Sequence, residues 1–133
     1  MCIRDSGEAA IIDPLRETKP YIDRITNDGV KLKYIFETHF HADFVSGHLD
    51  LSNLTDADIV YGPNANPNFK SIIAYDNQEF EIGDIKIKVL HTPGHTLESS
   101  TYLLIDESVS YTHLRAHETV LDLVCRLLLE KKK

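Results

Sequence analysis

Cysteine is scarce in this 133-residue chain, which contains only Cys2 and Cys125, near its opposite ends. Two cysteines without a paired spacing argue against a disulfide framework and against a zinc site made of thiolates. We therefore expect a reducing, cytoplasmic location. The sequence also lacks an apolar run of membrane-spanning length and a charged-then-apolar leader, so we expect neither a membrane span nor a signal peptide.

Clusters of basic residues are missing too, apart from the last three residues, 131–133. The formal net charge is -7, and phosphate binding needs grouped lysine and arginine side chains, so we expect no nucleic-acid partner. Small molecules and metal ions are better candidates. The length and the 42% hydrophobic content suit one globular domain with a real core, whereas no feature indicates the oligomeric state.

Short apolar segments alternate with helical patterns along the chain, which indicates an α/β fold. The first strand ends before Pro14, and the next, "KLKYIFET", runs directly into a group of histidines. The alternation predicts strands at 8–13, 31–38, 58–62 and 100–106, a hairpin around Gly83-Asp84, and helices over 21–27 and 44–54.

The segment "ETHFHADF" places His39, His41 and Asp43 two residues apart behind a buried strand. In an extended segment, residues two apart point the same way, so these three side chains can converge on one point. Neutral imidazoles and a carboxylate are ligands that zinc or iron(II) prefers. Solvated loop residues are the alternative, but three such residues at this spacing favour a metal site.

A second segment, "HTPGHT", follows a later strand and adds His91 and His95. Its Pro93-Gly94 pair predicts a tight turn, because proline fixes φ and glycine tolerates positive φ, and such a turn would hold His95 rigidly. His91 ends a strand and His48 lies within a predicted helix. We expect both to be structural residues that support the ligands instead of binding the metal.

Together, "THFHADF" and "HTPGHTLESS" resemble the metallo-β-lactamase fold family, an αββα sandwich, and are most similar to its branch of persulfide dioxygenases and rhodanese-linked metallo-hydrolases. The resemblance covers most of residues 7–107. It implies that His39 and His95 bind the metal, with His41 and Asp43 as ligands or close supporting residues. It also gives Asp43 a catalytic role in orienting water or substrate.

Two departures from the family pattern affect the expected chemistry. Phe44 stands where dinuclear members carry a further histidine, which predicts a single metal ion. The family's later aspartate and final histidine have no counterpart before the sequence changes character after Glu107. We therefore expect an incomplete sandwich, roughly its first half, whose first β-layer lacks a partner and whose chain is inactive by itself.

For the parent enzyme, the resemblance implies a mononuclear iron(II) centre that oxidises a persulfide or a related small thiol compound. The alternative is a zinc-dependent thiolester hydrolase of the glyoxalase II kind, in which metal ions activate water. A third possibility is a fragment without catalytic function.

The two ends of the chain carry a different resemblance. Acidic side chains outnumber basic ones in residues 7–107, whereas the reverse holds in residues 108–133. Periodicity alone predicts an amphipathic helix over residues 119–131. However, residues 1–6 ("MCIRDS") and about 109–133 resemble translated sequencing-adapter read-through. This implies a truncated domain at 7–107 and a non-native or unrelated tail at 108–133.

Overall fold

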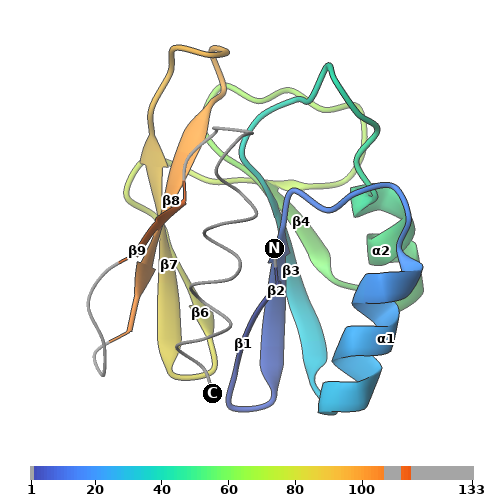
Figure 1. The fold of residues 1–133 in the computed structure, drawn as a ribbon. Helices are drawn as coiled ribbons and strands as arrows, with labels where there is room; N and C mark the ends of the chain where they lie inside the picture. The colour runs from blue at the N-terminus through green and yellow to red at the C-terminus, as the bar shows by residue number, and fades with distance from the viewer. Residues whose placement is uncertain (1, 107–111, 115–133) are drawn as a thin grey trace.

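The chain folds into two β-sheets packed face to face, with helices on the outer side of the first sheet (Figure 1). The computed structural model describes residues 2–106 and 112–114. The strands of the first sheet are β1 (Cys2–Asp5), β2 (Glu8–Ile12), β3 (Lys31–Glu37), β4 (Asp58–Tyr61) and β5 (Ile72–Ile73). Those of the second are β6 (Glu79–Ile82), β7 (Ile85–His91), β8 (Ser100–Ile105) and β9 (Thr112–Leu114). The helices are α1 (Lys19–Asp28) and α2 (His48–Thr55).

Strands β2 to β5 run parallel, and their order in space follows their order in the sequence. Parallel neighbours need crossover connections, which α1 provides between β2 and β3 and α2 between β3 and β4. This arrangement brings the carboxyl ends of β2 and β3 to the same edge of the sheet. The residues that follow these two strands are therefore neighbours in space.

The predicted strands, the hairpin and the first helix are confirmed to within two or three residues. The second helix was predicted too early, because α2 begins only at His48 and Phe44 lies in the preceding loop. The Gly47 N–H donates to Pro14 O at 3.1 Å, and Ser46 forms an isolated β-bridge with Leu15. This attachment holds the residues before Gly47 in a non-helical path.

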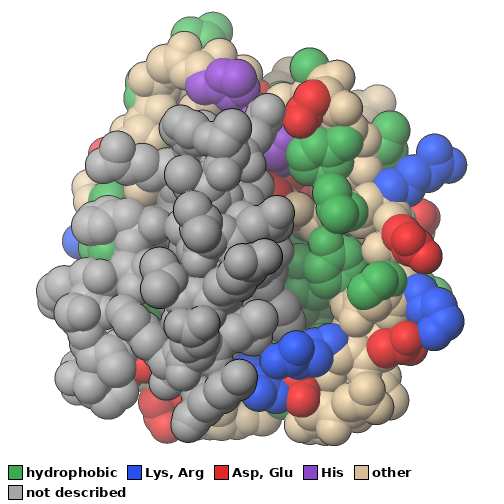
Figure 2. All heavy atoms as spheres, viewed as in Figure 1, with side chains coloured by type: hydrophobic (Ala, Val, Ile, Leu, Met, Phe, Trp, Pro, Cys, Tyr) green, Lys and Arg blue, Asp and Glu red, His purple; other side chains and the backbone are tan. Residues whose placement is uncertain are grey.

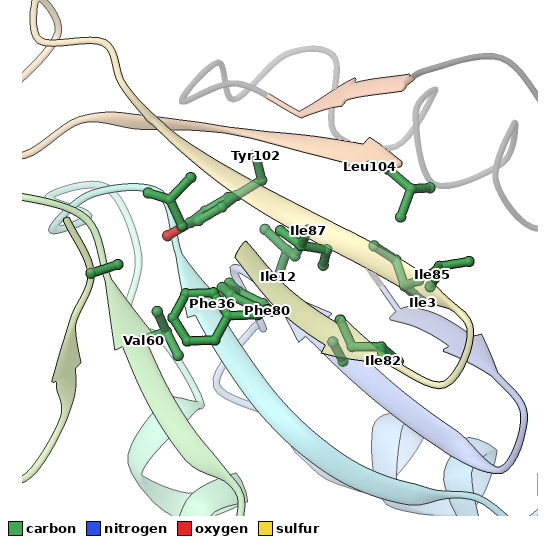
Figure 3. Packing of buried hydrophobic residues seen from close by; sticks show 13 residues of the cluster. Ile3, Ile12, Phe36, Val60, Phe80, Ile82, Ile85, Ile87, Tyr102 and Leu104 are labelled. Atoms are coloured by element: carbon green, nitrogen blue, oxygen red, sulfur yellow. The ribbon is translucent and has the colours of Figure 1, made fainter. Parts of the chain in front are cut away.

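Aromatic and aliphatic side chains from both sheets fill the space between them (Figure 3). The ring of Phe36 on β3 lies 5.0 Å from that of Tyr102 on β8 and 5.5 Å from that of Phe80 on β6, measured between centroids. The expectation that the first layer lacks a partner is therefore wrong. Strands β6 and β7 alternate buried and less buried residues, which gives the second sheet an apolar inner face.

A second cluster of buried residues lies between the first sheet and the helices. Ile25 of α1 and Leu51 of α2 pack there against Ile11 and Ile35 of the sheet. Strand β3 thus contributes side chains to both layers, which explains its uninterrupted apolar run at 34–36. The α/β class predicted from the sequence is confirmed.

Both ends of the described chain take part in sheets. Cys2–Asp5 pairs antiparallel with β2, and Ile3 is buried in the core between the sheets. Thr112–Leu114 pairs with β8. The division into residues 7–107 and 108–133 stays a prediction, and the helix predicted over residues 119–131 lies outside the described residues. Neither α1 nor α2 has the length and apolar character that a bilayer crossing requires.

Candidate metal centre

His39 follows β3 and is held by a chain of hydrogen bonds that begins at Asp13. The Thr38 N–H donates to Asp13 Oδ1 at 2.8 Å, and the Thr38 hydroxyl donates to Asp13 Oδ2 at 2.6 Å. The same hydroxyl oxygen lies 2.9 Å from His39 Nδ1. Because its proton is directed to the carboxylate, the oxygen accepts from His39 Nδ1–H. This tautomer leaves the lone pair of His39 on Nε2.

Three imidazole rings from two loops meet at this end of the molecule. The ring centroids of His39 and His41 are 4.2 Å apart, and those of His39 and His95 are 4.6 Å apart. His95 comes from the loop between β7 and β8, far from the other two in the sequence. In the space-filling view, exposed histidine surface appears toward the end of the molecule where the strand-end loops lie (Figures 1 and 2). The structure thus brings together three residues that the motifs predicted as ligands.

His41 is oriented by two buried carboxylates. Its Nε2 lies 2.9 Å from Asp13 Oδ1 and 3.4 Å from Glu37 Oε2. Its Nδ1 is buried and lies 4.0 Å from Asp43 Oδ1, and neither ring nitrogen reaches good hydrogen-bond geometry within the described residues. Burial would lower the pKa of His41, but the polar contacts and negative charge of Asp13 and Glu37 outweigh burial and raise it to about 10. The carboxylates therefore hold the Nε2 edge and leave Nδ1 on the side of Asp43.

Sequence analysis missed both Asp13 and Glu37. Each offers an oxygen within 4.8 Å of a ligand atom of His41, so the three residues could themselves be considered as a cation site. However, both oxygens of Asp13 already accept hydrogen bonds from Thr38, and the 2.9 Å contact with His41 has hydrogen-bond length. We interpret them as residues that orient His41. Their positions at the ends of the neighbouring strands "AAIID" and "YIFE" are the signal that could have found them.

The two carboxylates differ in their protonation. Burial raises the pKa of Glu37 to about 7, although the hydrogen bond to His41 opposes this effect. Burial acts in the same direction on Asp13, but there the hydrogen bond and charge of His41 prevail and lower the pKa. Asp13 therefore carries a negative charge beside Nε2 of His41, which favours a hydrogen on that nitrogen.

Asp43 and Phe44 lie on the outer side of His41. The Asp43 side chain is half exposed, at 50%, and its nearest recorded approach to the cluster is the 4.0 Å contact with His41. The Phe44 ring stacks on the imidazole of His41, with centroids 4.3 Å apart and planes 34° apart. Phe44 therefore packs against a predicted ligand and offers no donor atom to a second ion.

The two remaining candidate histidines lie outside the three-ring cluster. His48 begins α2, where its Nδ1 is 3.5 Å from Glu37 Oε1 and its ring is 5.1 Å from that of Phe69. Burial lowers the pKa of His48. His91 ends β7, its N–H donates to Asp76 Oδ1 at 2.9 Å, and its Nε2 lies 3.0 Å from Leu97 O. His48 thus contacts a carboxylate beside His41, whereas His91 secures the loop that carries His95.

That loop is shaped differently from the prediction. Gly94 does not have positive φ, so the expected use of glycine's conformational freedom at Pro93-Gly94 is wrong. Backbone hydrogen bonds hold the loop instead, from Thr92 N to Ser99 O at 3.0 Å and from Gly94 N to Thr96 O at 3.1 Å. Glu98 Oε1 accepts from the Phe40 N–H at 3.0 Å and so joins this loop to the one after β3.

The donor set suits a divalent transition metal. Imidazole nitrogens and a carboxylate are typical ligands of zinc and iron(II), and a buried Nδ1 without a hydrogen bond is costly unless something coordinates it. A family model of the metallo-beta-lactamase superfamily matches residues 1–112.

The chain belongs to the metallo-beta-lactamase superfamily.

Members of this superfamily with similar sequences include two enzymes named hydroxyacylglutathione hydrolase. The one from Tolumonas auensis is 36% identical over 100 residues, which cover 72% of this chain and 39% of the relative. The one from Rhizobium etli is 32% identical over 130 residues, which cover 96% of this chain and 48% of the relative. The chain therefore spans less than half the length of these relatives.

Solved structures of the superfamily agree with the fold. A metallo-beta-lactamase from Staphylococcus aureus superimposes with a TM-score of 0.69 at 38% identity, covering 77% of this chain and 32% of the other. ETHE1 from Myxococcus xanthus superimposes with a TM-score of 0.72 at 30% identity, covering 77% of this chain and 47% of the other. The family resemblance read from the two histidine motifs is thereby confirmed.

Proposed function

We propose that this chain carries the metal-binding part of a hydrolase that cleaves a thiolester of glutathione. The observation that carries the proposal is the meeting of three imidazole rings, those of His39, His41 and His95, in which His41 keeps a buried Nδ1 without a hydrogen bond within the described residues. The similarity to two hydroxyacylglutathione hydrolases supports this substrate class more than the persulfide expected first.

The proposed ligands are His39 through Nε2, His41 through Nδ1, and His95, with Asp43 at the open side. We favour zinc, because a site rich in imidazole with one open position is typical of zinc hydrolases, and we keep iron(II) as the alternative. A bound divalent ion would supply the Lewis acid that activates water and polarises the thiolester carbonyl. Asp43, half exposed beside the cluster, would orient the attacking water or the substrate by hydrogen bonding.

Each neighbouring residue then has a defined task. The Thr38 hydroxyl links Asp13 to His39 and so fixes the orientation of the His39 ring. Asp13 and Glu37 contact Nε2 of His41 and fix the orientation of that ring. Phe44 covers one face of the His41 ring and keeps water away from it. These contacts place two imidazoles before a metal arrives, which reduces the loss of conformational freedom on binding.

A persulfide-oxidising iron centre is the second candidate. The observation in its favour is Phe44, which brings an apolar ring instead of a ligand to the outer side of the cluster. A single iron held by two histidines and a carboxylate leaves positions for a sulfur compound and dioxygen.

The test is metal analysis of the purified chain combined with two activity assays. We expect zinc to bind, and we expect His39→Ala and His95→Ala each to abolish tight binding, whereas Glu81→Gln, at an exposed position of β6, leaves it unchanged. In a version of the chain extended to the length of its relatives, thiol release from an S-(2-hydroxyacyl)glutathione, without oxygen uptake from a glutathione persulfide, would identify the enzyme as the hydrolase. Metal binding that is insensitive to His39→Ala and His95→Ala would contradict the proposed centre.

A further inference from the structure

Glu37 is buried at the end of β3, and its carboxylate lies within 4 Å of three side chains of the segment that follows, those of His41, Ser46 and His48. We propose that Glu37 is a positioning residue that, together with Ser46 and His48, sets the orientation of His41 for metal binding. This inference rests on the proposed metal centre.

The burial of Glu37 makes its contacts energetically important. Its side chain is only 1% exposed, and a carboxylate removed from water is costly unless polar partners surround it. Oε1 accepts a short hydrogen bond from the Ser46 hydroxyl and lies 3.5 Å from His48 Nδ1. Oε2 lies 3.4 Å from His41 Nε2. The Glu37 carboxylate thus contacts two side chains of the loop, Ser46 and His41, and one at the start of α2, His48.

The backbone of Glu37 provides a rigid base for these contacts. Its carbonyl oxygen accepts from the hydroxyl of Tyr102, a fully buried residue of the opposite sheet. The loop is also attached to the segment after β2, since the Gly47 N–H donates to Pro14 O at 3.1 Å and the Ser46 hydroxyl lies 3.2 Å from the same oxygen. The position of Glu37 is therefore determined by both sheets.

Packing alone does not hold the imidazole of His41. A cavity of about 270 Å³ lies beside it, with Glu37, Phe44, His48 and Tyr61 among the residues that line it. A ring with free volume beside it can tilt unless polar contacts hold its edge. Asp13 holds Nε2 from one side, and a single contact permits rotation of the ring about that contact. The second carboxylate, Glu37, removes this freedom.

The consequence for metal binding follows from the direction of Nδ1. When Nε2 is held by two carboxylates, Nδ1 is directed to the side of Asp43, and its lone pair becomes more basic. Loss of Glu37 would leave the ring bound by Asp13 alone. We therefore expect Glu37→Gln to weaken metal binding through His41 while His39 and His95 stay in place.

The first experiment is zinc affinity by chelator competition on the full chain. Glu37→Gln keeps the size of the side chain and an oxygen for Ser46, and we expect it to weaken zinc binding about 10-fold to 100-fold. The matched control is Glu81→Gln, an exposed residue of β6, which should not change the affinity. Thermal unfolding with zinc removed by chelation should be similar for the two variants.

A double-mutant cycle separates positioning from a general structural effect. If Glu37 acts through His41, then Glu37→Gln in the His41→Ala background should cause no further loss of zinc affinity. An equal loss in both backgrounds, or unchanged affinity in Glu37→Gln itself, would overturn the proposal.

A second measurement does not depend on metal binding. Nitrogen-15 NMR of the imidazole rings reports which ring nitrogen carries the proton, and it can be recorded on the chelator-treated chain. We expect the Nε2 signal of His41 to shift in Glu37→Gln and to stay unchanged in Glu81→Gln. An unchanged His41 signal in both variants would overturn the positioning role. Absence of zinc binding by the unmutated chain, with a shifted signal, would instead refute the proposed function alone.

Discussion

Tyr102 of β8 donates its hydroxyl hydrogen to the backbone oxygen of Glu37 on β3, across 2.5 Å in the buried space between the sheets. The contact joins the two sheets directly below the loop that carries His39 and His41. It also satisfies a carbonyl group that has no access to water.

Removal of this hydroxyl should therefore cost stability. We expect Tyr102→Phe to lower the free energy of unfolding by about 1–3 kcal/mol, because a buried carbonyl loses its partner. Urea denaturation measures the change. Tyr75→Phe is the control, since Tyr75 is 69% exposed, and it should lie close to the unmutated chain. Equal stability of the two variants would show that the hydroxyl contributes nothing.

Thr38→Val should weaken the metal centre without opening a large cavity. Valine keeps the shape of threonine but breaks the path from Asp13 to His39, so the imidazole loses its fixed tautomer. We expect zinc affinity to fall about 10-fold or more. Thr38→Ser retains the hydroxyl and should bind zinc nearly as well. A similar loss in both variants would indicate that the methyl group, not the hydroxyl, matters.

Gly47→Ala should disturb the attachment of the metal-binding loop. A Cβ at Gly47 would lie 2.3 Å from Leu15 O, a backbone atom that cannot rotate away. We expect a loss of about 1–3 kcal/mol in the free energy of unfolding. Gly94→Ala is the control, because no atom lies within 4 Å of a Cβ placed there. Both are measured by thermal or urea unfolding, and a greater effect at Gly94 would contradict the described loop.

The turn of the β6–β7 hairpin should make stability depend on pH. The hydrogen bond from the Gly83 N–H, at 2.7 Å, and then that from Lys33 lower the pKa of Glu8 from 4.5. A lowered pKa in the folded state means that this contribution is present above the unfolded value and is lost as the pH falls. As the pH falls from 5 to about 3, the free energy of unfolding should therefore decrease more in the unmutated chain than in Glu8→Gln. Urea denaturation of both proteins at each pH measures this difference. Parallel curves for the two proteins would exclude this role.

Phe44→His tests why this position lacks a ligand. An imidazole there would replace an apolar ring that stacks on His41 and would offer a nitrogen near Asp43. We expect zinc stoichiometry to rise relative to the unmutated chain, as measured by metal analysis after dialysis. Phe44→Leu, which adds no donor atom, should leave the stoichiometry unchanged. A rise in both variants would attribute the effect to loss of the stacked ring.

Local sequence determined much of what is seen in this protein. Gly29 ends α1 in the left-handed conformation, with φ of 63°, and Gly83 at φ of 59° closes the β6–β7 hairpin. The hairpin at Gly83 was predicted from the alternation on either side of it, and glycine tolerates such angles at low cost. The spacing of His39 and His41, and the later His95, likewise predicted the three rings that meet, because short motifs at strand ends retain their geometry.

Tertiary structure alone decided how those rings are held. Asp13 and Glu37 are separated by a whole helix in the sequence and meet only because β2 and β3 are parallel neighbours with their carboxyl ends together. The partner of Phe44 was also beyond local reasoning, since a stacked ring depends on the path of the loop. Periodicity describes which face a residue occupies, whereas contacts between distant strands depend on register and packing, which a single sequence does not encode locally.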